Sequence, residues 1–274
     1  MRTNFRIACL AGLSFLGISA GTFAVHAADM PYDPPVIEAP EPMPLTSTGG
    51  WYLRGDIGYK YYNAPKASIS NPQFGNDTFV GHTAMWDEGL RGAFDVGIGA
   101  GYQFNDYLRA DVTLDYETPA KFDGNLYCPG GCPDGAPNGS NNLGYSIESA
   151  KITSWSALAN VYADLAHMNG FTPYIGAGAG ISYLETSGIQ SDSNPGVKYP
   201  GAGKTNFAWA LMAGVSYALT DQLSLDLGYR YLNLGDAQSG VIEDGVTDNP
   251  HSARLKYDNI DAHEVRLGVR YTIK

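Results

Sequence analysis

Apolar and polar residues alternate along most of this chain, in segments separated by polar stretches. The clearest segment covers residues 206–234, where every second residue is apolar over 207–219 and again over 223–231. Thr220 and Asp221 interrupt the pattern. Because successive side chains of a strand point to opposite faces, the pattern predicts a long hairpin with one apolar and one mostly polar face.

The length of these alternating runs indicates whether the strands belong to a soluble sheet or to a membrane. Strands of soluble sheets are about 5–6 residues long, whereas a tilted strand that crosses a membrane needs about 9–11. After the N-terminus the chain lacks the roughly 18 consecutive apolar residues of a transmembrane helix. The pattern therefore predicts eight membrane-spanning strands, at residues 51–62, 90–104, 107–117, 149–165, 172–184, 206–219, 223–234 and 258–273.

The connections between these strands alternate between long and short. Four long polar segments cover residues 63–89, 118–148, 185–203 and 235–257, and three short turns separate them. Bacterial outer-membrane barrels combine an even number of strands with short periplasmic turns and long outer loops. We therefore expect an all-β fold, an eight-stranded antiparallel up-and-down transmembrane β-barrel with four long extracellular loops.

Aromatic residues on the expected outward face gather in two bands. If the chain enters from the periplasm, one band lies near the outer strand ends and the other near the inner ends, with mostly Ala, Val, Ile and Leu between them. Two aromatic girdles around an apolar belt are typical of membrane barrels. The outer band is Tyr59, Tyr61, Phe94, Tyr116, Trp155, Tyr183, Phe207, Trp209, Tyr229 and Tyr231, and the inner band is Trp51, Tyr102, Phe104, Tyr217 and Tyr271.

The N-terminus has the features of an export signal. Arg2 and Arg6 precede an apolar segment at 7–25, and Val25-His26-Ala27 offers a small-residue cleavage site. We expect a cleaved signal peptide at 1–27; a membrane anchor is the alternative, which the cleavage site disfavours. Residues 28–50 are rich in proline and acidic residues, which predicts an extended periplasmic linker before the barrel at 51–274.

Net charge and cysteine content bear on the possible partners and on the cross-links of the chain. Without Arg2 and Arg6 the mature chain keeps 15 of its 17 basic residues against 28 acidic ones, a formal charge of −13 that opposes nucleic-acid binding. Cys128 and Cys132 remain, in a Cys-Pro-Gly-Gly-Cys segment. In an exported chain this spacing predicts a loop-pinning disulfide rather than a redox or metal site.

Charged residues also occupy the expected interior face, with both signs present. An eight-stranded barrel is just wide enough to be filled by side chains, so we expect these charges to pair across the lumen. Three alternatives stay open: a structural salt-bridge plug, a narrow polar path for small solutes, or a carboxylate pair acting as acid and base. The residues are Arg54, Asp56, Lys60, Asp95, Arg109, Asp111, Asp115, Glu117, Asp164, Asp226, Arg230, Glu264, Arg266 and Arg270.

Two sets of glycines share that interior face. Gly97, Gly99 and Gly101 are spaced by two, as are Gly176, Gly178 and Gly180. Such a row either leaves room for large side chains from across the lumen or lets the strand coil.

Two short segments resemble a known family. Gly49-Gly50-Trp51-Tyr52-Leu53-Arg54-Gly55-Asp56-Ile57-Gly58-Tyr59 and Arg266-Leu267-Gly268-Val269-Arg270-Tyr271 are similar to small porin-like outer-membrane proteins of alphaproteobacteria, which include major surface proteins of Brucella and rhizobia with an OmpA/OmpX-like barrel. The chain departs from such proteins at its end, which is Lys274 rather than an aromatic residue.

The resemblance implies a porin-like or structural protein of the bacterial outer membrane that supports envelope integrity, with small-solute passage as a further role. Its partners would be membrane lipid, lipopolysaccharide and the barrel-insertion machinery. The first rival is a surface adhesin or binding protein that engages a host or cell-surface ligand through its loops. The second is an enzyme at the outer rim, but no serine elbow or metal-ligand spacing occurs, so we expect neither catalysis nor a cofactor.

Overall fold

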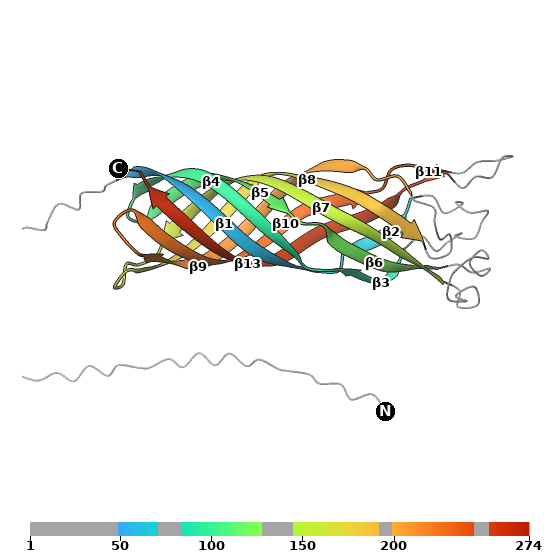
Figure 1. Ribbon diagram of the computed structural model, residues 1–274, viewed down its shortest axis with the longest axis horizontal. Coiled ribbons are helices and arrows are strands. Elements are labelled where there is room, and N and C mark those ends of the chain that lie inside the picture. Colours follow the sequence, from blue (N-terminus) through green and yellow to red (C-terminus); the bar gives the residue numbers. More distant parts are fainter. Residues whose placement is uncertain (1–48, 71–83, 128–144, 192–198, 244–251, 274) are drawn as a thin grey trace, which may run out of the picture. The chain divides into compact units, whose positions relative to one another are not determined.

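The computed structural model describes residues 49–70, 84–127, 145–191, 199–243 and 252–273 (Figure 1). The expected signal peptide, almost all of the linker, and the cysteine pair lie outside the described residues. No helix in the described part of the chain is long and apolar enough to cross a membrane.

Eight long antiparallel strands form the main sheet. They are β1 (Gly50–Tyr62), β4 (Ala93–Asn105), β5 (Leu108–Glu117), β7 (Tyr145–Asp164), β8 (Phe171–Ser191), β9 (Gly203–Ala218), β10 (Leu223–Gln238) and β13 (Leu255–Thr272). Shorter strands are β2 (Lys66–Ile69), β3 (Trp86–Leu90), β6 (Ala120–Tyr127), β11 (Ile242–Glu243) and β12 (Ser252–Ala253).

The sheet closes on itself. The pairing order runs β7-β5-β4-β1-β13-β10-β9-β8, and β8 pairs in turn with β7. Each long strand therefore has a hydrogen-bonded neighbour on both sides, and no long strand leaves a free edge. The predicted eight-stranded antiparallel up-and-down barrel is confirmed.

The two ends of the barrel differ. At one end, here named the turn end, β4 joins β5, β7 joins β8 and β9 joins β10 through short connections, and both β1 begins and β13 ends there. The opposite end, named the loop end, carries the longer connections and the short strands β2, β3, β6 and β11 (Figure 1).

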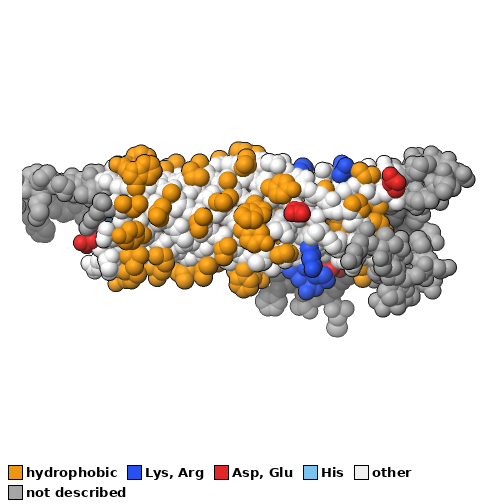
Figure 2. Space-filling model, turned by 45° about the horizontal axis from the view of Figure 1, so that its top comes forward, with side chains coloured by type: hydrophobic (Ala, Val, Ile, Leu, Met, Phe, Trp, Pro, Cys, Tyr) orange, Lys and Arg blue, Asp and Glu red, His pale blue; other side chains and the backbone are white. Residues whose placement is uncertain are grey.

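The outside of the barrel is apolar between these ends. Ile57, Val96, Leu211 and Val265 are each more than half exposed, as expected for side chains that face lipid. Aromatic pairs flank this belt: the rings of Trp51 and Tyr102 lie 5.3 Å apart toward the turn end, and those of Tyr116 and Trp155 lie 4.5 Å apart toward the loop end. Figure 2 shows hydrophobic side chains spread over this face, with Lys and Arg side chains gathered toward the loop end.

The boundaries predicted for the four long loops are wrong, because the barrel wall continues well into them. β2 and β3 lie in the first predicted loop, β6 and the start of β7 in the second, the end of β8 in the third, and parts of β10 and β13 in the fourth. The added wall encloses an apolar core that the sequence interpretation missed. Its larger members include Ile69, Leu90, Phe122, Ile152, Leu184, Ile189, Leu234, Leu255, Tyr257 and Ile260.

The alternation of polar and apolar faces reverses between the two halves of the wall. In the membrane belt of β10, Leu227 faces outward while Arg230 is buried inside. In β6, by contrast, Phe122 is buried inside against Tyr257, with ring centroids 4.7 Å apart, while Lys121 is exposed. Beyond the membrane the outside of the wall meets water, so the hydrophobic effect drives the apolar side chains inward.

Candidate functional site

The lumen of the membrane-spanning half holds a central ion-pair cluster from four strands. Arg230 of β10 lies 2.6 Å from Glu264 of β13 and 3.0 Å from Asp115 of β5. Arg266 of β13 approaches the other oxygen of Asp115 to 2.6 Å and lies 3.4 Å from Asp56 of β1. These side chains are almost fully buried, so the two arginines share Asp115 in a tightly closed cluster.

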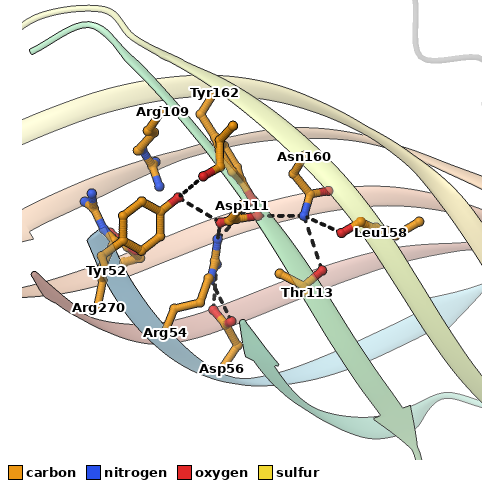
Figure 3. Close-up of polar contacts among 12 residues, drawn as sticks. Tyr52, Arg54, Asp56, Arg109, Asp111, Thr113, Leu158, Asn160, Tyr162 and Arg270 are labelled. Atoms are coloured by element: carbon orange, nitrogen blue, oxygen red, sulfur yellow. Dashed lines mark hydrogen bonds and ion pairs between the residues drawn. The ribbon is translucent and has the colours of Figure 1, made fainter. Parts of the chain in front are cut away.

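A second cluster surrounds Asp111 and is drawn in Figure 3. Tyr52 donates a hydrogen bond of 3.0 Å to one carboxylate oxygen of Asp111, and Asn160 donates one of 2.8 Å to the other. Arg54 lies 2.9 Å from Asp111 and 2.7 Å from Asp56. Because Asp56 also faces Arg266, Arg54 links this cluster to the central one.

Nearer the turn end, Arg109 is enclosed by aromatic rings. It pairs with Asp164 at 3.2 Å, and its guanidinium carbon lies 4.3 Å from the ring centre of Tyr162 and 4.7 Å from that of Tyr174. Cation–π contact of this kind is strongest where water is excluded, and Arg109 is fully buried. Arg109 and the two rings therefore fill part of the lumen at this level.

Two further pairs complete the described network, and one carboxylate stands apart from it. Lys60 lies 2.8 Å from Glu117, and Arg270 lies 3.3 Å from Asp226. Asp95 is buried, and neither of its carboxylate oxygens has a hydrogen-bond partner among the described residues.

Carboxylates outnumber cations in this described part of the lumen. Asp95 accounts for part of the excess, because no cation lies within ion-pair distance of it there. The eight carboxylates are Asp56, Asp95, Asp111, Asp115, Glu117, Asp164, Asp226 and Glu264, and the six cations are Arg54, Lys60, Arg109, Arg230, Arg266 and Arg270.

Little open space remains between these side chains. A cavity of about 20 Å³ lies among Arg54, Asn160, Tyr174 and Arg230. That volume holds about one water molecule. Inward glycines allow this dense filling, although the side chain beside Gly101 comes from a neighbouring strand rather than from across the lumen: a β-carbon on Gly101 would collide with the ring of Tyr52, its register partner on β1.

The structure brings together most of the residues that the sequence placed inside. The eleven lumenal charges expected to form a network all face the interior, ten of them in the pairs above, whereas Asp95 stands apart. Tyr162, Tyr174 and Asn160 were not singled out, although their alternation with outward residues such as Val161 was the available signal. The Cys128–Cys132 disulfide lies outside the described residues and stays a prediction.

A bulge in β10 interrupts the regular pairing of the barrel wall. The register with β13 shifts between Asn233 and Ala237, and Gly235 adopts a positive φ of 81°. Asp236 accepts a hydrogen bond of 3.0 Å from the backbone N–H of Asn259 and lies 3.0 Å from the ammonium of Lys204. Partial burial raises the pKa of the Asp236 carboxyl, but these two partners outweigh it and lower the pKa below its usual value.

The acidic and histidine side chains of the described residues are of the types that bind metal ions in proteins. In the ranges that the structure describes, no group of three or more His, Cys, Asp or Glu residues is placed to hold a metal ion.

The chain is similar to several known proteins. The family model described as "Outer membrane protein beta-barrel domain" matches residues 16–272. An uncharacterised protein of Brucella suis is 35% identical over 97% of this chain and 99% of its own length. A Rickettsia bellii protein whose name describes it as a candidate adhesin is 27% identical, over 81% of this chain and 88% of the relative. The crystal structure of the outer membrane protein OprG from Pseudomonas aeruginosa matches with a TM-score of 0.51 at 14% identity, covering 83% of this chain and 98% of that one, which concerns the fold alone.

Proposed function

The chain belongs to the outer membrane protein β-barrel domain family, and from this premise we propose that it is a structural surface barrel with a closed lumen. It resides in the bacterial outer membrane, where short turns face the periplasm and longer connections face outward. In this role it supports the envelope and presents its loop end to the exterior.

One observation carries the proposal: the lumen is filled at two successive levels. In the membrane belt, the central ion-pair cluster and the enclosed Arg109 span the interior. Toward the loop end the filling becomes apolar, with Phe122, Leu184 and Leu234 fully buried. An ion crossing the barrel would have to break buried ion pairs and then lose its hydration among apolar side chains, and both steps are costly.

Conductance in planar lipid bilayers tests this closed state. Purified mature protein should give no defined single-channel steps, under conditions where a porin reconstituted in parallel conducts. Regular steps from the unaltered chain would instead support small-solute passage, the porin-like alternative.

A surface-binding role is the second candidate, favoured by the candidate-adhesin name of the Rickettsia bellii relative. Deleting residues 71–83, 128–144, 192–198 or 244–251 removes no residue of a described strand. Binding of fluorescent barrels in nanodiscs to eukaryotic cells should then fall for one deletion while the barrel still folds. Equal binding by all four deletions would count against this role.

The N-terminal segments are part of the same proposal. Residues 1–27 direct export and are removed, residues 28–50 form a periplasmic linker, and the barrel-insertion machinery completes assembly. N-terminal sequencing of protein from outer membranes should begin at Ala28. A start at Met1 would indicate a retained anchor.

A further inference from the structure

Three basic side chains lie in a row across adjacent strands at the loop end, on the outside of the barrel. Lys121 of β6 and Lys151 of β7 are direct register partners, and the backbone N–H of Arg91 donates a hydrogen bond of 2.8 Å to the carbonyl of Lys121. All three side chains are exposed. With strands about 4.8 Å apart, the basic row, defined as Arg91, Lys121 and Lys151, covers about 10 Å of the wall.

The repulsion between these three neighbouring positive charges is unfavourable unless an anion lies beside them. Like charges directly opposite each other on neighbouring strands repel. Asp123 is the carboxylate within ion-pair distance of the row in the described part of the chain, at 3.1 Å from Lys121 and 3.5 Å from Arg91. Lys151 has no carboxylate at that distance among the described residues.

Other exposed acids lie outside the row. Glu185 of β8 stands opposite Thr153, whereas Lys151 stands opposite Ser187. Asp87 and Glu88 precede Arg91 along β3, farther toward the loop. The row itself therefore keeps an excess of positive charge over Asp123, and Glu185 stands two residues nearer the girdle, on β8 beyond Lys151.

The height of the row matches the lipid headgroups. Lys151 precedes Trp155 of the aromatic girdle by four residues on β7. At the rise and tilt of a membrane strand this places its backbone about 10 Å above the girdle. A lysine side chain is long and flexible enough to bend back toward the girdle, which brings its ammonium closer to the headgroup layer than its backbone.

We propose that the basic row binds the phosphate groups of an outer-leaflet lipid headgroup. Lys and Arg are the side chains that recognise phosphate, and three of them side by side match a headgroup with more than one phosphate. A membrane lipid fits better than a soluble polyanion, because the row lies on the side of the barrel just above the lipid-facing belt rather than at the loop tips. This inference goes beyond the closed-lumen proposal and does not depend on whether the barrel conducts.

Native mass spectrometry can count the lipids retained by full-length mature protein. Wild type is reconstituted in phosphatidylcholine with or without bis-phosphorylated lipid A and compared with Lys121→Gln/Lys151→Gln. The matched control is Lys66→Gln/Lys256→Gln, which removes the same charge from exposed positions elsewhere at the loop end. At about 1 kcal/mol per basic residue near a charged surface, the test variant should bind lipid A about 30-fold more weakly, and the control should bind like wild type.

Several results would overturn the site. Unchanged binding in the test variant would do so, and so would an equal loss in both variants, which indicates only general attraction to a charged surface. Equal retention of dephosphorylated lipid A would exclude phosphate recognition, and loss of heparin binding with lipid A binding intact would assign the row to a soluble polyanion. The single variant Lys151→Gln is the control for misfolding, because it leaves both contacts of Asp123 in place. It should still weaken lipid A binding while keeping the heat-modifiable gel mobility of a folded barrel.

Discussion

Arg230 and Glu264 stand directly opposite each other on β10 and β13, and their side chains form a buried ion pair of 2.6 Å inside the barrel. Around them Asp115 and Arg266 extend the pairing to β5. The most expensive groups to bury in a membrane protein are thus placed at the centre of the fold, where each depends on its neighbours.

Removing one member of this pair should be costly. Glu264→Gln leaves the guanidinium of Arg230 buried with half of its compensation, so we expect a loss of about 3–5 kcal/mol in unfolding free energy. Urea titration of the barrel in lipid vesicles measures it. The double variant Arg230→Met/Glu264→Met should recover much of the loss, since no unpaired charge then remains; a double variant as unstable as Glu264→Gln would contradict this account.

Substituting an inward glycine should destabilise the barrel far more than substituting an outward one. A β-carbon at Gly101 would meet the Tyr52 ring at 2.5 Å and Asp111 at 2.6 Å, so Gly101→Ala should cost about 1–3 kcal/mol. Gly55 faces outward and has nothing within 4 Å of that position, which makes Gly55→Ala the matched control. The same urea titration should show a shift for Gly101→Ala alone.

The apolar core at the loop end should support that half of the wall independently of the membrane. Phe122 is fully buried against Tyr257, so Phe122→Ala should lose about 3–5 kcal/mol. The lipid-facing Ile98→Ala should lose much less. Limited proteolysis separates the two, because cleavage should become faster near the loop end in Phe122→Ala only, and equal cleavage rates would argue against a structural role for this core.

Acid should weaken the bulge in β10. The lowered pKa of Asp236 means that its contacts stabilise the fold above the usual aspartate pKa of about 3.9 and are lost as the pH falls through the lower folded value. Asp236→Asn removes that contribution at neutral pH. Hydrogen exchange of the backbone amides around the bulge, where β10 lies between β9 and β13, should therefore be faster in Asp236→Asn than in wild type at pH 7. The two rates, corrected for intrinsic exchange, should converge in strong acid.

The expected disulfide of Cys128 and Cys132 has a direct test. Intact mass of non-reduced protein should be lower than that of reduced protein by two hydrogens, and alkylation should label neither residue. Labelling of both before reduction would show free thiols.

The membrane-spanning half of the fold could be predicted because its alternation is strict. Leu225, Leu227 and Tyr229 face outward while Asp226 and Arg230 lie inside, so the period and the interior charges can be read from the sequence. The partners of those charges could not be read, because Arg230 and Asp115 meet only through the register of the closed sheet. The upper wall was missed because its alternation is inverted and short: Phe122 is one of few large apolar residues among the polar neighbours in β6.

The length of the wall determines how far the described strands reach beyond the membrane. β8 has 21 residues, which at about 3.3 Å per residue and a tilt near 40° spans roughly 50 Å along the barrel axis. An apolar band of about 25 Å accounts for only half of that height. The upper wall therefore carries the described strand ends roughly 20 Å beyond this apolar band. In the proposed orientation, a macromolecule that approaches from outside therefore meets the ends of these strands before it reaches the lipid.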